Sequence, residues 1–276
     1  MYPAGVARKA EGKKAAGGAP LEQDIEIGTG TARITRETDG TLTLFVNGVP
    51  SSEVHPDPLT LSFEYMRWIR CTVDELHAPP APVRVTHLGG GACTLARAIA
   101  AGHPGSRQLV VELDRVLAEN ARAWFDLPRS PEVRVRAADA IATLPTLPEA
   151  GCDVLIRDVF AGDETPTSLT TLAAAQQARR AVGQQGSYLV NCAAKPGTTL
   201  LADEYATLSE AFKQVHVIAE PGVFKKRRYG NCVLLAADVA PPAGLERALR
   251  RDAVTVRLLS GGDLAQLARQ GNVITA

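Results

Sequence analysis

The feature that most constrains the fold of this chain is a run of three glycines at positions 89–91. They follow the β-rich residues 83–88 and precede residues 94–101, whose composition favours a helix. Glycines let the backbone turn sharply and approach a ligand closely, and the helix that follows points its free amide groups at the same ligand. Glycines also serve plain turns and close helix packing, so the neighbouring segments must decide between these interpretations.

Residues 108–111 form a second expected strand, which ends at Glu112. In nucleotide-binding sheets of this type, an acid about twenty residues after the glycine turn accepts hydrogen bonds from the ribose hydroxyls. Taken alone, Glu112 would be a solvated strand end. The preceding turn and helix favour nucleoside binding instead, with Gly89, Gly90, Gly91 and Glu112 as the binding residues.

Two more acids lie after the ends of later strands. Residues 133–136 lead to Asp139, and residues 152–156 lead to Asp158. The carboxyl ends of the strands in an open α/β sheet converge on one crevice, so we expect Glu112, Asp139 and Asp158 to face one pocket. Two alternatives stay open, because Asp139 could instead cap the following helix and Asp158 could be a loop acid.

The rest of the chain divides into units with distinct patterns. Residues 25–46 alternate around Asp39-Gly40, which predicts a small antiparallel hairpin unit. A helical segment at 59–76 ends at a proline-rich break before the main sheet. Further helices are expected at 168–181, 200–212, 245–250 and 263–269, and further strands at 187–191, 215–218 and 232–236.

Composition excludes several classes of function. The 276 residues include 30 basic and 30 acidic side chains, so no net field would recruit nucleic acid or an anionic membrane. No apolar run reaches membrane-spanning length, and the N-terminal segment lacks the apolar core of a signal peptide. The five cysteines and five histidines show no metal-ligand spacing. We expect a cytoplasmic enzyme with reduced thiols, no metal and a small-molecule acceptor.

These segments resemble, in order, the motifs of the spermidine synthase-like family, which has the class I methyltransferase sheet. The motifs of that family read roughly LDGV, GGGDG, VEID, GD with a small residue, and YDVIIxDxxDP. The matching segments here are 46–49, 89–93, 111–114, 138–140 and 152–158. The resemblance extends over about residues 24–239, and the ordered series of motifs makes it specific.

The resemblance and the strand pattern together predict the architecture. We expect an α/β fold with a doubly wound, mostly parallel, seven-stranded Rossmann-like methyltransferase sheet and a small N-terminal antiparallel β unit. The expected units are a disordered basic tail at 1–22, the hairpin unit at 23–58, a nucleoside-binding catalytic domain at 59–240 and a C-terminal extension at 241–276. Relatives dimerise through the N-terminal hairpin, so a homodimer is a further expectation.

The resemblance also implies an S-adenosyl sulfonium donor, either decarboxylated S-adenosylmethionine or S-adenosylmethionine itself. It implies that Glu112 holds the ribose, that Asp139 with the small Ala140 meets the adenine, and that the glycine turn lies near the sulfonium. Asp158 is then the catalytic acid beside the reacting centre, where it accepts the proton of an attacking amine and stabilises the developing cation.

The chain departs from the family at positions that hold amines. Ala92 replaces the turn aspartate that holds the aminopropyl amine, and Ala161 replaces the second acid after the fourth strand. The Tyr-His-Glu segment of the family corresponds to Ser-Phe-Glu at 62–64. A dicationic acceptor such as putrescine needs carboxylates in place of its lost hydration, so we do not expect putrescine as the acceptor. The expected substrate-binding residues are Asp163, Glu164 and Tyr229.

Four consecutive cations occupy positions 225–228, directly before Tyr229. Beside the pocket they would repel a polyamine and attract an anionic acceptor or the carboxylate of an intact donor. The alternative is a solvated loop, which is the usual role of such a run.

Three hypotheses for the function remain. The first is an aminopropyltransferase with an amine acceptor other than putrescine, and the second is an S-adenosylmethionine-dependent methyltransferase on a small acceptor, including an anionic one. The third is a non-catalytic nucleoside-binding protein. Asp158 argues against the third, because simple nucleoside binding does not require an acid at that strand end.

Overall fold

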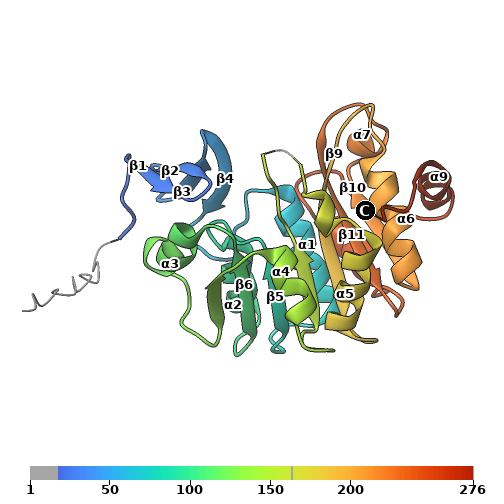
Figure 1. Ribbon diagram of the computed structural model, residues 1–276, viewed down its shortest axis with the longest axis horizontal. Helices are drawn as coiled ribbons and strands as arrows, with labels where there is room; N and C mark the ends of the chain where they lie inside the picture. Colours follow the sequence, from blue (N-terminus) through green and yellow to red (C-terminus); the bar gives the residue numbers. More distant parts are fainter. Residues whose placement is uncertain (1–17, 163, 276) are drawn as a thin grey trace, which may run out of the picture.

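The computed structural model describes residues 18–162 and 164–275 as two β-sheets, with helices around the larger sheet (Figure 1). Most of the tail expected at 1–22, together with Asp163, lies outside the described residues. The smaller, N-terminal sheet is antiparallel, with its strands in chain order. They are β1 (Asp24–Ile27), β2 (Gly30–Arg36), β3 (Leu42–Val46) and β4 (Val49–Val54). The hairpin predicted around Asp39-Gly40 joins β2 to β3.

Within the described residues, the larger sheet has eight strands in the order β12-β10-β11-β9-β8-β5-β6-β7. They are β5 (Arg84–Leu88), β6 (Arg107–Glu112), β7 (Val133–Ala137), β8 (Val154–Arg157), β9 (Ser187–Ala194), β10 (Gln214–Ala219), β11 (Gly230–Ala237) and β12 (Arg257–Leu258). Strands β5 to β9 pair in parallel, and β10, β11 and β12 pair antiparallel. The predicted α/β sheet is confirmed, and the two-residue β12 adds an edge strand to the seven expected.

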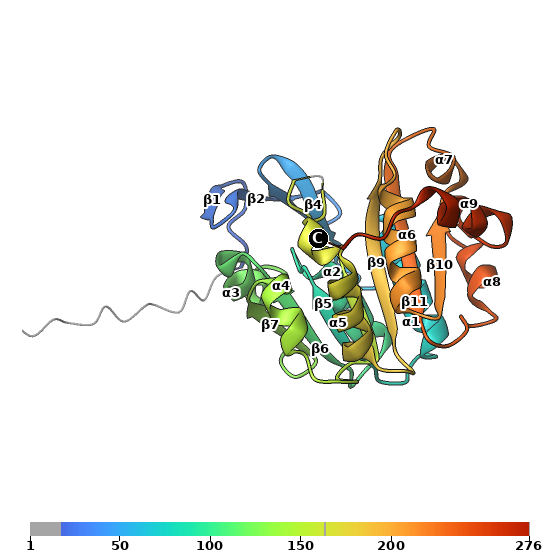
Figure 2. The same ribbon diagram turned by 45° about the vertical axis from the view of Figure 1, so that its right-hand side comes forward.

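Helices cover both faces of the larger sheet (Figures 1 and 2). Side chains alternate along each strand, so Ile156 of β8 packs in the core that contains Trp68, and Leu155 packs in the core that contains Ala178. Helices α1, α2 and α8 lie on the first face, and α4, α5 and α6 on the second. The helices are α1 (Glu64–Leu76), α2 (Thr94–Gly102), α3 (Arg115–Trp124), α4 (Ala140–Thr143), α5 (Leu172–Val182), α6 (Leu200–Ala211), α7 (Pro221–Phe224), α8 (Leu245–Leu249) and α9 (Gly262–Gln270), with 3-10 turns at Leu144–Thr146 and Thr167–Leu169.

Helix α1 begins at Glu64, five residues later than the periodicity predicts. The carboxylate of Asp57 accepts hydrogen bonds from Leu59 N at 3.0 Å and from Thr60 Oγ1 at 3.1 Å. This local turn satisfies backbone and side-chain donors that a helix would otherwise use. No helix in the described part of the chain is long and apolar enough to cross a bilayer.

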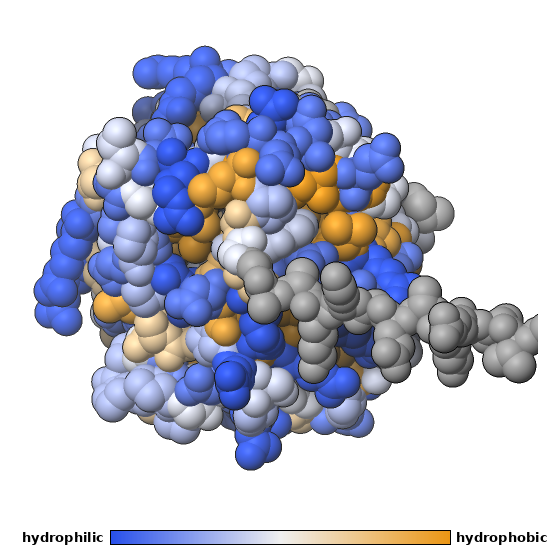
Figure 3. Space-filling view, turned by 90° about the vertical axis from the view of Figure 1, so that its left-hand side faces the viewer, coloured by the Kyte–Doolittle hydropathy of each residue, from blue (hydrophilic) through white to orange (hydrophobic). Residues whose placement is uncertain are grey.

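The N-terminal sheet packs against the part of the main domain that carries the glycine turn. Its inner side chains, among them Ile34 and Leu44, share a core with Cys93 at the turn and with Leu117 of α3. The end of the molecule that carries this sheet also exposes apolar residues among polar ones (Figure 3). Val49, at the start of β4, is 63% exposed.

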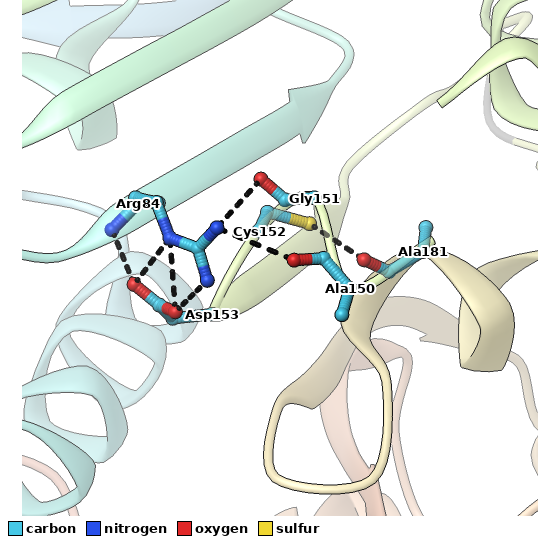
Figure 4. Close-up of polar contacts among 6 residues, drawn as sticks. All are labelled: Arg84, Ala150, Gly151, Cys152, Asp153 and Ala181. Atoms are coloured by element: carbon cyan, nitrogen blue, oxygen red, sulfur yellow. Dashed lines mark hydrogen bonds and ion pairs between the residues drawn. The ribbon is translucent and has the colours of Figure 1, made fainter. Parts of the chain in front are cut away.

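The amino-terminal ends of β5 and β8 are joined by an ion pair between Arg84 and Asp153 (Figure 4). Arg84 N donates to Asp153 Oδ2 at 2.8 Å, and Arg84 Nη2 donates to Asp153 Oδ1 at 2.5 Å. Arg84 Nη1 also reaches the carbonyl oxygens of Ala150 and Gly151. Burial alone would raise the pKa of Asp153, but the hydrogen bonds from Arg84 outweigh it and hold that pKa below its ordinary value.

We expect Asp153→Ala to lower the free energy of unfolding by about 1–2 kcal/mol, because it removes charge-assisted hydrogen bonds at a partly exposed site. A depressed carboxyl pKa contributes stability at neutral pH that is lost as the pH falls through the folded-state pKa. Urea denaturation at pH 7 and at acid pH measures both effects, and the difference from wild type should shrink in acid. Asp24→Ala, which breaks the exposed pair with Arg33, is the matched control and should cost less than about 0.5 kcal/mol. Equal losses in both variants would contradict this account.

Candidate active site

The glycine turn passes close to the end of β8. Gly89 has a φ of +89° and Gly91 a φ of +50°, a region that favours glycine. A Cβ on Gly89 would lie 2.1 Å from the carbonyl oxygen of Asp158, and a Cβ on Gly91 would lie 2.7 Å from Ser52 Oγ. Residue 89 must therefore be glycine for the turn to lie directly against the backbone of Asp158.

The carboxylate of Glu112 holds this turn in place. Glu112 Oε2 accepts hydrogen bonds from Gly90 N at 3.0 Å and from Gly91 N at 2.8 Å. Glu112 Oε1 accepts a third from Asp114 N at 2.9 Å. A carboxylate has about four acceptor positions, so three amides leave room for a ligand hydroxyl. Glu112 and the glycine turn, which are predicted to bind one nucleoside, lie in contact, and the Glu112 side chain orders the turn.

Asp114, two residues further on, connects three parts of the fold. It is 2% exposed, and its Oδ1 accepts hydrogen bonds from Val116 N and Leu117 N at the start of α3. Its Oδ2 accepts from both the backbone N and the Oγ1 of Thr29, in the turn between β1 and β2. The N-terminal sheet is thus attached directly to the end of β6.

Asp139 is the N-cap of α4, and its Oδ1 accepts a hydrogen bond from Ile141 N at 2.8 Å. The capping alternative is therefore present in the structure, and it leaves the other carboxylate oxygen for a ligand. Ala140 is 7% exposed, whereas Ile141 is 39% exposed. Leu113, which follows Glu112 on the neighbouring strand, is 63% exposed. Two apolar side chains are thus left open to solvent beside the two predicted donor-binding acids.

Asp158 lies between two side chains from distant segments. Tyr65 of α1 donates its hydroxyl to Asp158 Oδ2 at 2.9 Å, and Asn191 of β9 donates Nδ2 to Asp158 Oδ1 at 2.9 Å. Burial raises the pKa of Asp158 above the ordinary carboxyl value, although both hydrogen bonds oppose the shift. Burial and the nearby Asp158 raise the pKa of Tyr65 well above its ordinary value, so its hydroxyl stays protonated.

Asn191 has a buried acceptor without a partner. The residue is 1% exposed, and its Oδ1 accepts no hydrogen bond from the described residues. An ionised Asp158 cannot donate, so the amide nitrogen of Asn191 must face it and the carbonyl oxygen must point elsewhere. An unpaired buried acceptor costs about 1–3 kcal/mol, which a ligand N–H would recover.

A hollow that is partly open to solvent lies beneath the glycine turn and reaches Asp158. Asp158 is the single charged group among its described lining residues, because burial lowers the pKa of His87 to about 4 and leaves that imidazole neutral. His87 Nε2 pairs with Gln108 Oε1 at 2.9 Å. The hollow therefore favours a cationic or neutral group over an anion. Its lining residues are Met66, His87, Gly89, Gly90, Cys93, Leu95, Ala96, Val110, Ile156 and Asp158.

Ala92, which replaces the turn aspartate of the family, is fully buried. Its backbone N donates to Ser52 Oγ of the N-terminal sheet at 3.3 Å. Of the predicted substrate-binding residues, Glu164 pairs with Lys195 at 3.1 Å and Tyr229 is 50% exposed, and neither lines the hollow. Asp163 lies outside the described residues. The half-buried Glu64 precedes Tyr65 in α1, and its Oε1 accepts from Asn231 Nδ2 at 3.2 Å.

Sequence reasoning missed four residues around the predicted acids: Tyr65, Leu113, Ile141 and Asn191. Asn191 carried a usable signal, because it is a polar residue within the otherwise apolar end of a predicted strand. Tyr65 lies in a predicted helix, and nothing else in the sequence indicated that it belongs to the site. Among the described residues, no cluster of histidine, cysteine or acidic side chains could hold a metal ion, and all five cysteines are free thiols.

Comparisons with known proteins found chains that are similar in sequence and in fold. A probable spermidine synthase from Corynebacterium glutamicum ATCC 13032 is 34% identical in sequence, with a TM-score of 0.86 over 94% of this chain and 97% of that one. The polyamine aminopropyltransferase of Vibrio vulnificus is 26% identical over 175 residues, or 62% of this chain. The chain spans 56% of the length of that curated relative. No family model matches the chain.

A second solved structure shows the fold alone. It is a spermidine synthase in complex with the transition state analogue AdoDATO, which is 16% identical, with a TM-score of 0.60 over 89% of this chain and 85% of that one. The likeness to the Corynebacterium protein, by contrast, extends over nearly the whole of both chains at 34% identity. This chain belongs to the spermidine synthase-like family, whose named members are transferases, and the resemblance drawn from its motifs is confirmed.

The close approach of Gly89 to Asp158 can be tested by adding one methyl group. Gly89→Ala should reduce the free energy of unfolding by roughly 1–3 kcal/mol more than Gly48→Ala, because overpacking against backbone adds to the cost of a positive φ. Gly48 is the matched control, since it has a φ of +79° but nothing within 4 Å of a built Cβ. Chemical denaturation of both variants measures the difference. Equal destabilisation would show that the turn has room to shift.

Proposed function

We propose that this chain is a transferase that binds an S-adenosyl sulfonium donor and moves its aminopropyl group to an amine acceptor other than putrescine. The observation that carries the proposal is the carboxylate of Asp158, held by Tyr65 and Asn191 at the hollow beneath the glycine turn. Membership of a family whose named members are spermidine synthases and a polyamine aminopropyltransferase supports the same class of reaction.

The donor nucleoside would bind across the ends of β6 and β7. In this proposal the free acceptor position of Glu112 takes a ribose hydroxyl, and Asp139 meets the adenine amino group. The exposed side chains of Leu113 and Ile141 would cover the apolar faces of the adenine, which gives a reason for their exposure. A fold neighbour, the spermidine synthase bound to AdoDATO, supports a donor of this type.

Electrostatics favour the decarboxylated donor over the intact one. An intact donor carries a carboxylate, and the described lining of the hollow holds no cation and one anion, Asp158. Decarboxylated S-adenosylmethionine carries only positive charge and would be attracted by Asp158. This contrast makes aminopropyl transfer the first candidate.

In the reaction, the acceptor nitrogen would use its lone pair to attack the carbon bound to the sulfonium. A C–N bond forms, the C–S bond breaks, and its electron pair leaves on sulfur as the neutral thioether methylthioadenosine. The carboxylate of Asp158 takes the proton released by the nitrogen, and burial makes it a stronger base than an exposed carboxylate. Asn191 Oδ1 would accept a second N–H and so orient the lone pair toward the donor.

The far end of a diamine acceptor would be poorly neutralised. Ala161 has no acidic group, and Glu164 is already paired with Lys195. A buried ammonium without a carboxylate is costly, which supports an acceptor with a single amine at the reacting end. A homodimer through the N-terminal sheet is part of the same proposal, supported by the apolar residues exposed at that end.

One observation favours methyl transfer as a second candidate. In the family, an aspartate in the glycine turn holds the ammonium of the aminopropyl group. Ala92 stands at that position here, and it is buried and uncharged, so the ammonium would lack this partner. In that case the acceptor would take the methyl group of intact S-adenosylmethionine and leave S-adenosylhomocysteine. A chain that binds a donor but transfers neither group would be a nucleoside-binding protein.

We expect Glu112→Ala to weaken methylthioadenosine binding by about 1.5–3 kcal/mol, the range for a charge-assisted hydrogen bond. Calorimetric titration measures the loss. Free adenine lacks the ribose, so its affinity should change little, which separates a lost ribose contact from a disordered turn. Glu119→Ala, on the exposed side of α3, is the control substitution and should change neither affinity. An unchanged affinity for methylthioadenosine in Glu112→Ala would contradict the proposed donor site.

We expect Asp158→Asn to reduce transfer about 10²–10⁴-fold, the usual contribution of a positioned general base. The variant should fold, because the new amide nitrogen can donate to a flipped Asn191 amide while Tyr65 donates to the single oxygen that residue 158 keeps. Both labelled donors are assayed against a panel of amines that includes putrescine, and donor affinity is measured in parallel. Because the variant lacks the charge of Asp158, decarboxylated S-adenosylmethionine should bind it more weakly, so transfer is compared at saturating donor.

Three results would revise the proposal. Full activity of Asp158→Asn would make Asp158 a loop acid. Turnover of putrescine at about 1–10 per second, a typical enzymatic rate, would contradict the acceptor proposal. Tight donor binding with no transfer across the panel would favour the non-catalytic alternative.

A further inference from the structure

A second hollow, open to solvent, lies where the C-terminal extension folds back onto the main domain. Helices α6, α7 and α9 surround it, together with the residues that follow β9 (Figure 1). Its floor is apolar and buried, with Ala194, Leu201, Val223 and Leu267 all at most 9% exposed. These residues belong to the core on the α5 and α6 face of the sheet. The hollow shares no lining residue with the one that contains Asp158.

Polar side chains surround this apolar floor. Gln266 and Gln270 are four residues apart on α9 and so lie on one side of that helix. Thr198 and Lys195 follow the end of β9, and Lys226 follows α7. An apolar base with a few convergent polar groups is the usual composition of a small-molecule site.

Lys226 has an unusual conformation that brings it to the rim. Its φ is +56°, which is uncommon for a residue with a side chain, and its Nζ donates to the carbonyl oxygen of Thr198 at 3.1 Å. An ammonium has three donors, so two remain for another acceptor. Among the described residues, no carboxylate forms an ion pair with Lys226. Lys226 is an exposed residue, as the solvated-loop alternative for the cluster at 225–228 expects, but this hydrogen bond holds its ammonium at the rim.

Both charged residues that line this hollow, Lys195 and Lys226, are cations. Lys225 and Arg227 likewise have no carboxylate partner in the described part of the chain, whereas Arg228 pairs with Glu220. Lys195, also on the rim, pairs with the exposed carboxylate of Glu164. This contact shows that the rim can bind a carboxylate. A field of this sign attracts anions and repels polyamines.

We propose that this second hollow binds a small amphipathic anion, with a carboxylate or monophosphate on Lys226 and an apolar body on Leu201, Val223 and Leu267. The side-chain amides of Gln266 and Gln270 supply further hydrogen-bond donors at the rim. This proposal goes beyond the proposed function and does not rest on it, because none of the residues that line the hollow beneath the glycine turn takes part.

The test uses the full-length chain with labelled leucine and valine methyl groups, observed by NMR during titration with benzoate and with phenyl phosphate. Both probes combine an apolar ring with an anion, and they separate carboxylate from phosphate recognition. The methyl signals of Leu201, Val223 and Leu267 should shift saturably. Those of Leu95 and Val110, which line the hollow beneath the glycine turn, should not shift. Benzyl alcohol and benzylamine are the neutral and cationic controls and should bind at least about fivefold more weakly, since a partly exposed ion pair is worth about 1 kcal/mol.

The variant Lys226→Met keeps the length of the side chain but removes its charge, and it should weaken both anions about fivefold or more. Lys225→Met removes the neighbouring charge, which does not line the hollow, and should change affinity less than about twofold. Unchanged signals of Leu95 and Val110 show that each variant is folded. The proposal is overturned if neither anion causes saturable shifts at about 10 mM, if benzyl alcohol binds as well as benzoate, or if both variants lose affinity equally.

Discussion

Two acids at the end of β6 organise the parts of this protein that meet at the proposed donor site. Glu112 binds the amides of the glycine turn, and Asp114 binds both the start of α3 and the turn between β1 and β2. Charge-assisted hydrogen bonds to backbone amides are among the stronger polar contacts in a folded chain. Because these carboxylates fix the turn, the helix and the N-terminal sheet together, the position of Gly89 against Asp158 follows from them.

The region around Asp158 retains interactions that cost stability. Its carboxylate is buried, with a raised pKa, and the neighbouring Asn191 Oδ1 has no partner among the described residues. A folded carboxyl whose pKa is raised binds its proton more tightly than it does in the unfolded chain, so it costs stability as the pH rises above its ordinary value. Unsatisfied groups of this kind are common where a protein is arranged to bind a ligand.

The sequence predicted the elements whose signals are local. The glycine turn, the strand ends at Glu112 and Asp158, and the hairpin at Asp39-Gly40 all follow from short-range patterns. The start of α1 was wrong by five residues, because the periodicity does not reveal the hydrogen bonds of Asp57. The two-residue β12 is too short to produce a pattern of its own.

The contacts of the candidate site were harder to predict because they join distant segments. Tyr65 and Asn191 reach Asp158 from 93 and 33 residues away in the chain, and only the packing of α1 and β9 brings them there. Glu164 follows Asp158 closely in sequence, yet its side chain pairs with Lys195 outside the hollow. Likewise, the cations at 225–228 do not line the hollow with Asp158, and Lys226 reaches a separate one.

The central claim is that the charge of the hollow beneath the glycine turn selects a decarboxylated donor. Calorimetric titration of the wild-type chain with decarboxylated S-adenosylmethionine and with S-adenosylmethionine, in separate experiments at neutral pH, tests it most directly. The decarboxylated donor should bind at least about tenfold more tightly, equivalent to 1.4 kcal/mol, because Asp158 is the only charge that lines the described hollow. Equal or tighter binding of the intact donor would contradict the claim and favour methyl transfer.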